Sequence, residues 1–532
     1  MTGPRFSIIT PVYDPPAAVL ADTLASVRAQ SFTDWELVLV DDASPSPHVA
    51  PMLAEAASLD ARVKVITRAQ NGGIVAASND GLAAATGEFI ALLDHDDLLE
   101  RRALEVVDVY VRNNPEMDYA YSDEDHLTPE GRYVNPFYKP DWSPERLRSQ
   151  NYCCHLSVFR HTLLDEIGGF REGFEGSQDY DLILRATERA RQIVHIPFVL
   201  YHWREIPTSV AADPDAKPYA WDAGRRAVQA HCDRVGIAAT VEESEPKGTL
   251  RVRRHIVGDP LISIIIPTCG STGRPWGVER CYAVGAIESV KRHTTRNIEF
   301  VLVIDDWTPP RWIEAMQRAV GDTPTKIVMF DRPFNFSEKM NLGSVHASGD
   351  LLLLLNDDIE VITDEFLDPM IPLAFEPDVG AVGSKLYFED GRLQHGGHVY
   401  NGDPYHIFFR RGGDEMGPLA LLSVQRECIG VTAACMLIRP DVFAEVGGFC
   451  TWFAGNFNDV DLNLKLQTKG YRAVWTPFSE LYHFESATRD PTITVEEHEL
   501  IKMRWAERLH HDPYYNPNLA PRRDDWVERG LR

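Results

Sequence analysis

The sequence contains no hydrophobic run long enough to cross a membrane. Its longest uninterrupted aliphatic stretch is the leucine run at 351–355, whereas a spanning helix needs about 20 predominantly apolar residues. The opening MTGPRFSIITPVYD has no basic segment followed by a long apolar core, which a secretory signal requires. We therefore expect a cytoplasmic protein. No basic amphipathic anchor is evident, so peripheral association with the inner face of the plasma membrane would depend on a lipid-linked substrate.

Paired cysteines and an excess of positive charge are also missing. The eight cysteines form no C-x-x-C pair, which argues against a zinc ribbon and favours a reduced intracellular chain. The 53 lysines and arginines are outnumbered by 79 aspartates and glutamates, giving a formal net charge of −26. Because phosphates repel such a chain, we expect no nucleic acid as its main partner. The balance fits an ordinary acidic enzyme, or one that handles anionic substrates through metal ions.

An internal repeat organises the 532 residues, a length for which about 150 residues per domain predicts two to four domains. Five blocks recur in order: FSIITP as ISIIIP, WELVLVDD as EFVLVIDD, GEFIALLDHDD as GDLLLLLNDD, QDYDL as NDVDL, and LYHW as LYHF. The copies are 262 residues apart at the third block (358 − 96) and 280 at the fourth (459 − 179), so the difference of about 18 falls in one loop region. The repeat predicts homologous domains at 1–210 and 258–490, a helical and extended linker at 211–257 and a helical extension at 491–532.

Each copy alternates strand and helix signals. In the first copy, apolar runs at 7–10, 36–40, 63–66 and 88–93 are typical of buried parallel strands. Leu20, Leu24 and Val27 recur at helical spacing and predict an amphipathic helix over 15–30. This alternation indicates an α/β fold in which each copy is a doubly wound, Rossmann-like sheet. Ligands bind such sheets beyond the carboxyl ends of the strands.

Acidic residues follow the last of these strands. In LDHDD, alternation along an extended backbone puts Asp94 and Asp96 on one side, and two carboxylates there suit Mg²⁺ or Mn²⁺. The second copy reads LLNDDIE, so aligning the leucines places Asn356 at the Asp94 position and Asp358 at the Asp96 position. A solvated acidic turn is the alternative for a lone D-x-D, and the position of this motif within the ordered repeat argues against that alternative.

Paired aspartates end the second strand of each copy, Asp41 and Asp42 in the first and Asp305 and Asp306 in the second. A carboxylate at that edge can accept the imide N–H of uracil or thymine, which favours a UDP- or dTDP-activated donor. The alternative for one member of each pair is a helix-capping acid. An N-G-G loop begins at Asn71; its glycines permit close backbone approach to a ligand, although N-G-G alone is an ordinary turn.

A further aspartate opens a helix in each copy. Asp179 in QDYDL and Asp459 in NDVDL follow Gly/Phe-rich loops at the start of apparent helices, where the positive end of the helix dipole favours an ionised carboxylate. Such a carboxylate can accept the proton of an acceptor hydroxyl. A helix N-cap is the alternative role, and Asp181 and Asp461 are the second candidates for the base.

The ordered motifs P-V-Y-D, V-D-D-A-S, N-G-G-I-V-A-A-S-N, L-D-H-D-D, Q-D-Y-D-L and L-Y-H-W-R resemble those of family 2 glycosyltransferases with the GT-A fold. Their paired arrangement resembles the bacterial tandem glycosyltransferases that assemble O-antigen, capsule and rhamnose-containing polysaccharides. The resemblance covers nearly the whole chain. It implies two GT-A domains in tandem, each with a doubly wound mixed sheet.

The resemblance also implies roles for individual residues. Asp179 and Asp459 would be the catalytic bases of an inverting transfer. The metal ligands would be Asp96 and Asp358, joined by the histidines of the L-Y-H motifs, His202 and His483. The nucleotide-sugar sites would be lined by Thr10, Pro11, Tyr13, Asp41, Asp42, Asn71 and Asp94 in the first copy and by Pro267, Thr268, Asp305, Asn341 and Asn356 in the second. Among the paired acids, Asp41 and Asp305 are favoured as base readers.

Together these features predict a metal-dependent, bifunctional inverting glycosyltransferase. It would use Mn²⁺ or Mg²⁺ and move sugars from UDP- or dTDP-sugar donors to a growing cell-surface polysaccharide or glycolipid, including a lipid-linked glycan acceptor. The main alternative is one catalytic domain plus a degenerate glycan-binding domain, which Asn356 keeps open. A sugar nucleotidyltransferase is a weaker alternative, because PVYDPP offers no Gly-rich, basic phosphate loop. A non-enzymatic interaction protein is weaker still.

Overall fold

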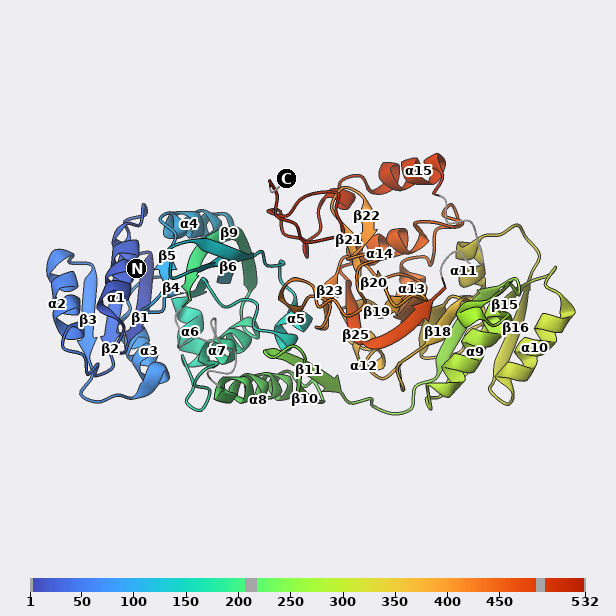
Figure 1. Ribbon diagram of the computed structural model, residues 1–532, viewed down its shortest axis with the longest axis horizontal. Helices are drawn as coiled ribbons and strands as arrows, with labels where there is room; N and C mark the ends of the chain where they lie inside the picture. Colours follow the sequence, from blue (N-terminus) through green and yellow to red (C-terminus); the bar gives the residue numbers. More distant parts are fainter. Residues whose placement is uncertain (1–2, 206–217, 485–492, 531–532) are drawn as a thin grey trace. The chain divides into compact units, whose positions relative to one another are not determined.

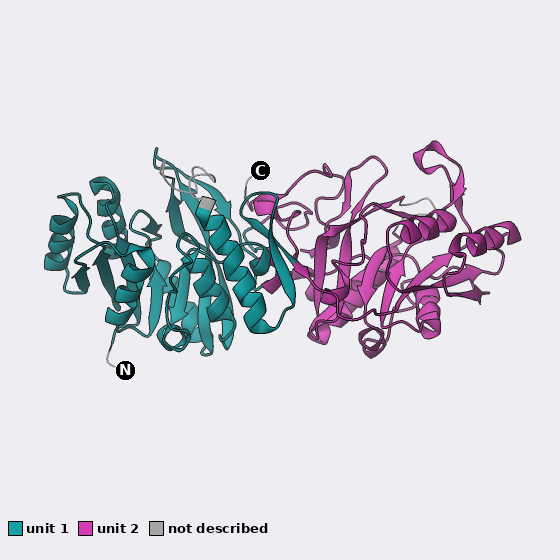
Figure 2. Ribbon diagram, turned by 90° about the horizontal axis from the view of Figure 1, so that it is seen from below, with its two compact units in different colours: residues 1–142, 147–252, 516–518 teal, residues 143–146, 253–515, 519–532 magenta. Residues whose placement is uncertain are grey.

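The computed structural model describes residues 3–205, 218–484 and 493–530. Two compact units make up the chain (Figure 2): unit 1 comprises residues 1–142, 147–252 and 516–518, and unit 2 comprises residues 143–146, 253–515 and 519–532. Most of the segment at 211–257 belongs to unit 1. Its described part forms helix α8 (Pro218–Val235) and the hairpin of β10 (Ala239–Ser244) and β11 (Thr249–Arg254).

The described part of unit 1 is built on a nine-stranded mixed sheet of order β3-β2-β1-β4-β8-β6-β9-β5, with β7 paired to β6 (Figure 1). Its strands are β1 (Phe6–Val12), β2 (Trp35–Asp41), β3 (Val63–Thr67), β4 (Phe89–Leu92), β5 (Leu98–Leu99), β6 (Met117–Leu127), β7 (Tyr133–Phe137), β8 (Ser157–Arg160) and β9 (Gln192–Arg204). Strands β3, β2, β1 and β4 are parallel, and β8 joins β4 in the antiparallel sense. The carboxyl ends of the four parallel strands therefore meet at one edge.

Helices cover both faces of this sheet because its strands are apolar on both sides. They are α1 (Ala17–Arg28), α2 (Val49–Leu59), α3 (Gly73–Ala84), α4 (Ala103–Asn113), α6 (His161–Ile167) and α7 (Gln178–Thr187), with α5 (Pro144–Ser149) shared between the units. Phe6 and Ile8 of β1 join a buried cluster with residues of α1, α2 and α4. Ile9 joins a second cluster with residues of α3, α6, α7 and α8. Successive residues of one strand thus face opposite cores, and the predicted doubly wound α/β class is confirmed.

Unit 2 repeats this plan around a ten-stranded sheet of order β16-β15-β12-β17-β24-β19-β25-β18, with β20 paired to β19 and β23 to β25. Its sheet strands are β12 (Ile262–Thr268), β15 (Ile298–Asp305), β16 (Thr325–Phe330), β17 (Leu351–Leu355), β18 (Ile359–Val361), β19 (Val379–Tyr387), β20 (Leu393–His395), β23 (Arg426–Cys428), β24 (Cys435–Ile438) and β25 (Arg472–His483). Its α-helices are α9 (Tyr282–Arg292), α10 (Pro310–Val320), α11 (Phe336–His346), α12 (Ile371–Ala374), α13 (Pro440–Glu445), α14 (Asn458–Thr468) and α15 (Val495–Trp505). The capping box predicted at Thr494 and Glu497 begins α15.

In the described residues of unit 2, two short hairpins and three 3₁₀ turns complete the list of elements. They are β13 (Thr272–Gly273) with β14 (Arg280–Cys281), β21 (His398–Tyr400) with β22 (Pro404–His406), and the turns at Pro275–Gly277, Pro418–Ala420 and Arg508–His510. The β21–β22 hairpin lies between β20 and β24 in the chain. Unit 2 therefore carries extra structure in the loop region where the spacing between the copies changes.

A buried glutamate occupies the same place in both units. Ser7 Oγ donates to Glu36 at 2.6 Å, as Ser263 Oγ does to Glu299 at 2.6 Å. The backbone N–H groups of Thr86 and Ser348 complete the match, each 2.6 Å from its glutamate. A network repeated atom for atom requires the same pairing of strands, so the two units are copies of one fold.

The strand registers adjust the correspondence that the sequence blocks indicate. Phe6 pairs with Trp35 and Ile262 pairs with Ile298. Counting onward from these pairs, Asp42 of the first copy is the counterpart of Asp305. WELVLVDD and EFVLVIDD are therefore offset by one residue from the alignment that their shared letters favour.

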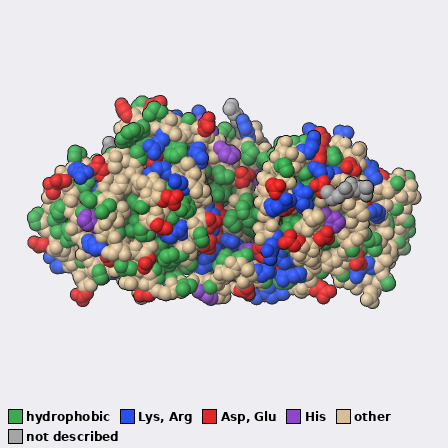
Figure 3. Space-filling view, turned by 180° about the vertical axis from the view of Figure 1, so that it is seen from behind, with side chains coloured by type: hydrophobic (Ala, Val, Ile, Leu, Met, Phe, Trp, Pro, Cys, Tyr) green, Lys and Arg blue, Asp and Glu red, His purple; other side chains and the backbone are tan. Residues whose placement is uncertain are grey.

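Within the described residues, no helix combines the length and the apolarity that crossing a bilayer demands. On the face drawn in Figure 3, acidic and basic side chains are intermingled, with hydrophobic side chains between them. On this face, therefore, the acidic side chains are not gathered into one acidic surface.

Candidate active sites

Acids and a histidine gather where β4 of unit 1 ends. The metal-ligating atoms of Asp94, Asp97 and His155 all lie within 4.8 Å of one another. Asp97 is buried and accepts hydrogen bonds from Tyr201 Oη at 2.6 Å and from the Arg204 N–H at 2.8 Å. Burial raises the pKa of Asp97 well above its usual value, and the charges of the neighbouring aspartates add to this shift. Such crowding of carboxylates favours a bound cation, which would relieve their repulsion.

His155 is a member of this cluster that sequence reasoning missed. Its ring stacks on Tyr201, with centroids 4.5 Å apart and planes 11° from parallel. It lies just before β8, and only the antiparallel pairing of β8 with β4 brings it beside Asp94 and Asp97. No local motif marks it, because its partners are about 60 residues away in the chain (155 − 94).

Asp96 and His202, the predicted metal pair of unit 1, lie outside this group of three clustered residues. The charge of Asp96 is one of the causes that raise the pKa of Asp97, after burial. His202 is buried on β9 and uses Nδ1 in a 2.6 Å hydrogen bond with Asp125, while its Nε2 is 3.7 Å from Glu100. The structure therefore surrounds His202 with carboxylates other than Asp96.

Asp179 lies in the first turn of helix α7, as expected, and close to Asp94. Its Oδ2 accepts a hydrogen bond from Asn151 Nδ2 at 2.9 Å. Burial is the main cause that raises the pKa of Asp94, and the charge of Asp179 contributes to the rise. Asp181, the second candidate for the base, is fully buried in ion pairs with Arg171 and Arg185. Both oxygens of the Asp181 carboxylate are therefore engaged in ion pairs that stabilise the helix.

The predicted nucleotide residues of unit 1 lie at or near the carboxyl ends of the parallel strands: Thr10 and Pro11 are in β1, Asp41 ends β2, and Tyr13 and Asp42 directly follow these strands. Asp42 is held by Arg68 and by the N–H groups of Gly72 and Gly73, at 2.6, 2.9 and 2.8 Å. Asp41 accepts a 3.0 Å hydrogen bond from the Ser44 N–H. Thr10 is buried, Pro11 is half-buried, and Tyr13 and Asn71 are exposed. These residues share the sheet edge at which Asp94 lies.

Unit 2 brings its predicted metal residues into direct contact. His483 Nε2 is 3.1 Å from Asp358 Oδ1 and 3.1 Å from Asn356 Nδ2, while its Nδ1 lies 2.9 Å from Gln394 Oε1. Since an amide oxygen only accepts, Nδ1 carries the proton and Nε2 presents a lone pair. Among the described residues Asp358 Oδ1 has no hydrogen-bond donor. The Nε2 lone pair accepts a hydrogen bond from Asn356 Nδ2, so a cation between His483 and Asp358 would have to displace that bond.

The turn after β17 is one residue shorter than its counterpart in unit 1. Leu98 pairs with His202, and Ile359 pairs with His483, so Asp358 directly precedes its strand as Asp97 does in unit 1. The position of His155 is taken by Ala434. Unit 2 thus keeps one of the three clustered side chains of unit 1, with Asn356 and Ala434 in place of the other two.

The remaining predicted residues of unit 2 are engaged within the fold. Asp305 forms a 2.6 Å ion pair with Lys339, although burial raises the pKa of Asp305. The Asn341 amide bonds both the N–H and the C=O of Phe449, at 2.8 and 2.9 Å. Thr268 Oγ1 donates to Asp357 at 2.6 Å, and burial together with the charge of Asp358 raises the pKa of Asp357 to about 7. Pro267 precedes Thr268 in buried β12. The Asn341 side chain, through its bonds to Phe449, holds the loop that leads toward α14.

Asp459 begins α14 and accepts a hydrogen bond from the Ala433 N–H at 3.4 Å. Burial lowers the pKa of His398 to about 3, and the charge of Asp459 opposes that shift. Asp459 therefore lies close to His398, which belongs to the region that unit 2 carries in addition. Asp461, the second candidate, is fully buried and paired with Arg504 at 2.7 Å.

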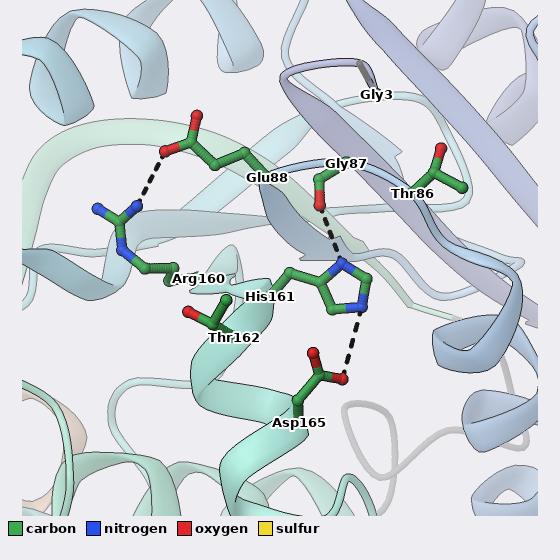
Figure 4. Close-up of a pocket in the computed structure, with 8 residues that line it drawn as sticks. All are labelled: Gly3, Thr86, Gly87, Glu88, Arg160, His161, Thr162 and Asp165. Atoms are coloured by element: carbon green, nitrogen blue, oxygen red, sulfur yellow. Dashed lines mark hydrogen bonds and ion pairs between the residues drawn. The ribbon is translucent and has the colours of Figure 1, made fainter. Parts of the chain in front are cut away.

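A separate pocket of about 460 Å³ lies at the opposite edge of the sheet of unit 1. Figure 4 shows it lined by residues that precede β1 and β4 or begin α6, with Glu88 paired to Arg160 and His161 bonded to Gly87. No predicted site residue is among the eight described residues that line it. The pocket is thus distinct from the edge that carries the acids.

Comparison with known proteins matches the chain to the family described as Glycosyl transferase family 2, over residues 7–168 and 263–447. The chain is 41% identical over 540 residues to the uncharacterized protein y4gI of Sinorhizobium fredii, covering 99% of this chain and 58% of that protein. It is 38% identical over 523 residues to the O-antigen biosynthesis protein RfbC of Myxococcus xanthus, covering 97% of this chain and 40% of that protein. The chain therefore spans less than two thirds of these relatives.

Shorter matches concern one part of the chain each. The chondroitin synthase of Escherichia coli is 30% identical over 186 residues, 35% of this chain and 27% of that protein. The crystal structure of S. aureus TarS 1–349 in complex with UDP superposes with a TM-score of 0.34 and 20% sequence identity, over 43% of this chain and 65% of that chain.

Proposed function

Because the chain belongs to glycosyl transferase family 2, we propose that it is a bifunctional inverting glycosyltransferase with one active site in each unit. The donors are UDP- or dTDP-sugars, and the acceptor is a growing cell-surface polysaccharide or glycolipid. The observation that carries the proposal is the position of Asp179, which lies in the first turn of a helix and close to Asp94, whose carboxylate clusters with that of buried Asp97. The name of the relative RfbC, an O-antigen biosynthesis protein, supports a polysaccharide product.

The base of unit 1 is Asp179. Asn151 orients its carboxylate through the 2.9 Å hydrogen bond to Oδ2, and the free lone pairs take the proton of the acceptor hydroxyl. The hydroxyl oxygen then attacks the anomeric carbon from the side opposite the leaving diphosphate, which inverts the configuration. Asp459 has the same role in unit 2, held by the Ala433 N–H.

A divalent cation fits the acids in both units, and we propose Mn²⁺ or Mg²⁺. Asp94, Asp97 and His155 would hold it in unit 1, with Asp96 beside them; Asp358 and His483 would hold it in unit 2. When bound, it would neutralise charge on the departing nucleoside diphosphate. Without it, the carboxylates of Asp94, Asp96 and Asp97 repel one another, which adds to the rise that burial gives the pKa values of Asp94 and Asp97.

The nucleotide is placed by the edge formed by β1 and β2. Asp41 and Asp42 in unit 1, and Asp305 in unit 2, are the carboxylates at the ends of these strands, and the proposal gives one of them in each unit the pyrimidine imide. In unit 1, Arg68 and the Gly72 and Gly73 N–H groups fix Asp42. This leaves Asp41 as the proposed reader of uracil or thymine. We place the reaction on the cytoplasmic side of the membrane, where a lipid-linked acceptor would bring the enzyme to the inner face.

The test is transfer by the full chain and by D179N and D459N, with a panel of UDP- and dTDP-sugars and Mn²⁺. Each variant should lose one linkage by about 10²–10⁴-fold, the usual contribution of a general base, and should keep the other. The matched controls are D165N and D441N, which change carboxylates that are 73% and 79% exposed in units 1 and 2. Full transfer by both base variants would overturn the assignment.

One observation favours a second candidate function for unit 2. Asn356 and Ala434 stand where unit 1 has Asp94 and His155, so unit 2 has fewer side chains for a cation. Unit 2 would then be a degenerate glycan-binding module. In that case D459N would retain every linkage that the unaltered chain makes, while D179N would retain none.

A further inference from the structure

A cluster of three histidines lies in unit 2 outside the predicted ligand set. His395 ends β20, and the other two face each other across the β21–β22 hairpin, where His398 pairs with His406. The ligand nitrogens of the three rings lie within 4.8 Å of one another. The ring centroids are 4.8 to 5.0 Å apart, and the planes cross at 80° to 82°. The rings therefore meet edge to face around a common centre.

The cluster belongs to structure that unit 1 lacks. Leu393 is the counterpart of Tyr133, and Ala434 is the counterpart of His155. The chain between these positions takes 41 residues in unit 2 (434 − 393) and 22 residues in unit 1 (155 − 133). The longer segment adds the β21–β22 hairpin, which carries two of the three histidines and is drawn in orange beside α14 (Figure 1).

We propose that His395, His398 and His406 bind one divalent transition-metal ion of the zinc class, separate from the carboxylate site at Asp358. Three imidazole nitrogens suit Zn²⁺, Co²⁺ or Ni²⁺, whereas Mg²⁺ and Ca²⁺ prefer oxygen ligands. Three protein ligands leave the fourth tetrahedral position for water or a hydroxyl. The site lies close to the proposed transferase site, since the charges of His483 and Asp459 act on His395 and His398, but it uses none of the residues assigned to the transfer.

The burial of the site supports this assignment. His395 is fully buried and His398 is 3% exposed, and burial lowers the pKa of His398 to about 3. Both rings are thus in the neutral form that metals bind. Burial is the main cause that lowers the pKa of His395, followed by the charges of the other histidines and of Arg426. The Asp459 carboxylate lies near His398 and opposes the lowering of its pKa.

Metal binding requires a small rearrangement, which the geometry identifies. His395 Nδ1 and His406 Nδ1 are 2.8 Å apart, and in a tetrahedral site with bonds of about 2.0–2.1 Å two nitrogens lie about 3.3 Å apart. The pair must open by about half an ångström. The Thr432 N–H, now 3.2 Å from His395 Nε2, must also move away, because a metal on Nδ1 leaves the ring proton on Nε2.

The experiment uses the full chain, stripped of metal by a chelator and titrated with Co²⁺ in the presence of excess Mg²⁺. We expect one equivalent of Co²⁺ with the intense visible absorption of four-coordinate cobalt, displaced by one equivalent of Zn²⁺. H406Q, at the half-buried position, should weaken Co²⁺ binding by at least tenfold, and H398Q/H406Q should abolish the absorption. Zn²⁺ should raise the unfolding temperature of the unaltered chain but not that of the double variant.

Two matched variants separate this site from others. H346Q removes an exposed histidine of α11 in the same unit, and D358N removes the carboxylate of the proposed transferase site; both should retain the cobalt spectrum. Weak, six-coordinate absorption in the unaltered chain, equal binding by H398Q/H406Q, or loss of the spectrum in D358N would each overturn the proposal. The first two results would instead identify the cluster as hydrogen-bonded packing.

Discussion

Asn151 shows how a single residue prepares the base of unit 1. Its Nδ2 donates to Asp179 Oδ2 at 2.9 Å, and a hydrogen bond to a charged group contributes about 1.5–3 kcal/mol. We expect N151A to lower kcat by about 10–100-fold, which corresponds to that energy. KM for the donor should change little, because the bond orients the base rather than the nucleotide. Steady-state kinetics of the linkage made by unit 1 measures both constants.

The control is the double variant N151A/D179N. If Asn151 acts through Asp179, adding N151A to D179N should cost no further activity, since the pair then shows full coupling. A further tenfold loss in the double variant would contradict a positioning role and would indicate that Asn151 contacts the acceptor itself.

Some site residues can be predicted from local sequence patterns, and others cannot. Asp94 follows a strand, so the strand pattern places it at the edge where ligands bind, whereas Asp179 is marked by its helix start and by the family resemblance. His155 reaches the cluster only through the pairing of β8 with β4. A contact made by two strands distant in the chain leaves no periodic signal, so the sequence could not predict this histidine.

At the scale of elements, a buried glutamate ties β2 to β1 and to the loop before β4 in unit 1, and its counterpart does so in unit 2. Burial alone would raise the pKa of Glu36, but its bonds to Lys64, Ser7 and Thr86 lower it overall, and Glu299 is lowered in the same way. Because the folded pKa lies below the unfolded value near 4.5, the carboxylate stabilises the fold above that pH. This stability is lost as the pH falls through the folded pKa.

We therefore expect E36Q to cost about 1–3 kcal/mol at pH 7, the range for a buried charged group deprived of its partners, and E299Q to cost a similar amount. The difference between each variant and the unaltered chain should shrink when the pH falls below about 4.5. Urea unfolding at pH 7 and pH 3.5 measures it. E55Q, which changes an exposed glutamate of α2, is the control; a penalty that stays constant with pH would contradict the network.

The same elements show why the copies could be recognised but not aligned residue by residue. Apolar strands predict the doubly wound sheet, because their pattern repeats whatever the register. Shared letters such as V-D-D cannot detect a shift of one residue, and here Asp42 rather than Asp41 corresponds to Asp305. Likewise, the turn before β18 is one residue shorter than the turn before β5. Asp358 therefore directly precedes its strand, as Asp97 does in unit 1. Hydrogen-bond registers, which are long-range, decide both.

For the molecule as a whole, the two copies have kept the frame and diverged at the sites. The buried glutamate makes the same hydrogen bonds in both units. By contrast, the counterparts of Asp94, Asp97 and His155 in unit 2 are Asn356, Asp358 and Ala434. Unit 2 has gained a histidine-bearing hairpin in its own segment. A frame shared by two sites of different composition is expected when each unit acts on its own donor or acceptor.

This divergence predicts different metal requirements within one chain. In D459N the remaining activity reports unit 1, and in D179N it reports unit 2. Loss of even an outer partner of a metal site typically costs about 10–100-fold in affinity, so with Asn356 and Ala434 as replacements unit 2 should need at least tenfold more Mg²⁺ for half-maximal transfer. Mg²⁺ is the proper titrant, because the three histidines of the proposed zinc-class site bind it poorly.

The variant N356D, made in the D179N chain, restores a carboxylate and should lower the Mg²⁺ requirement toward that of unit 1. N114D, remote from the edge at the end of α4, should not. Equal Mg²⁺ dependence of the two single-site chains, with no response to N356D, would show that the second site does not use its acids to hold a cation.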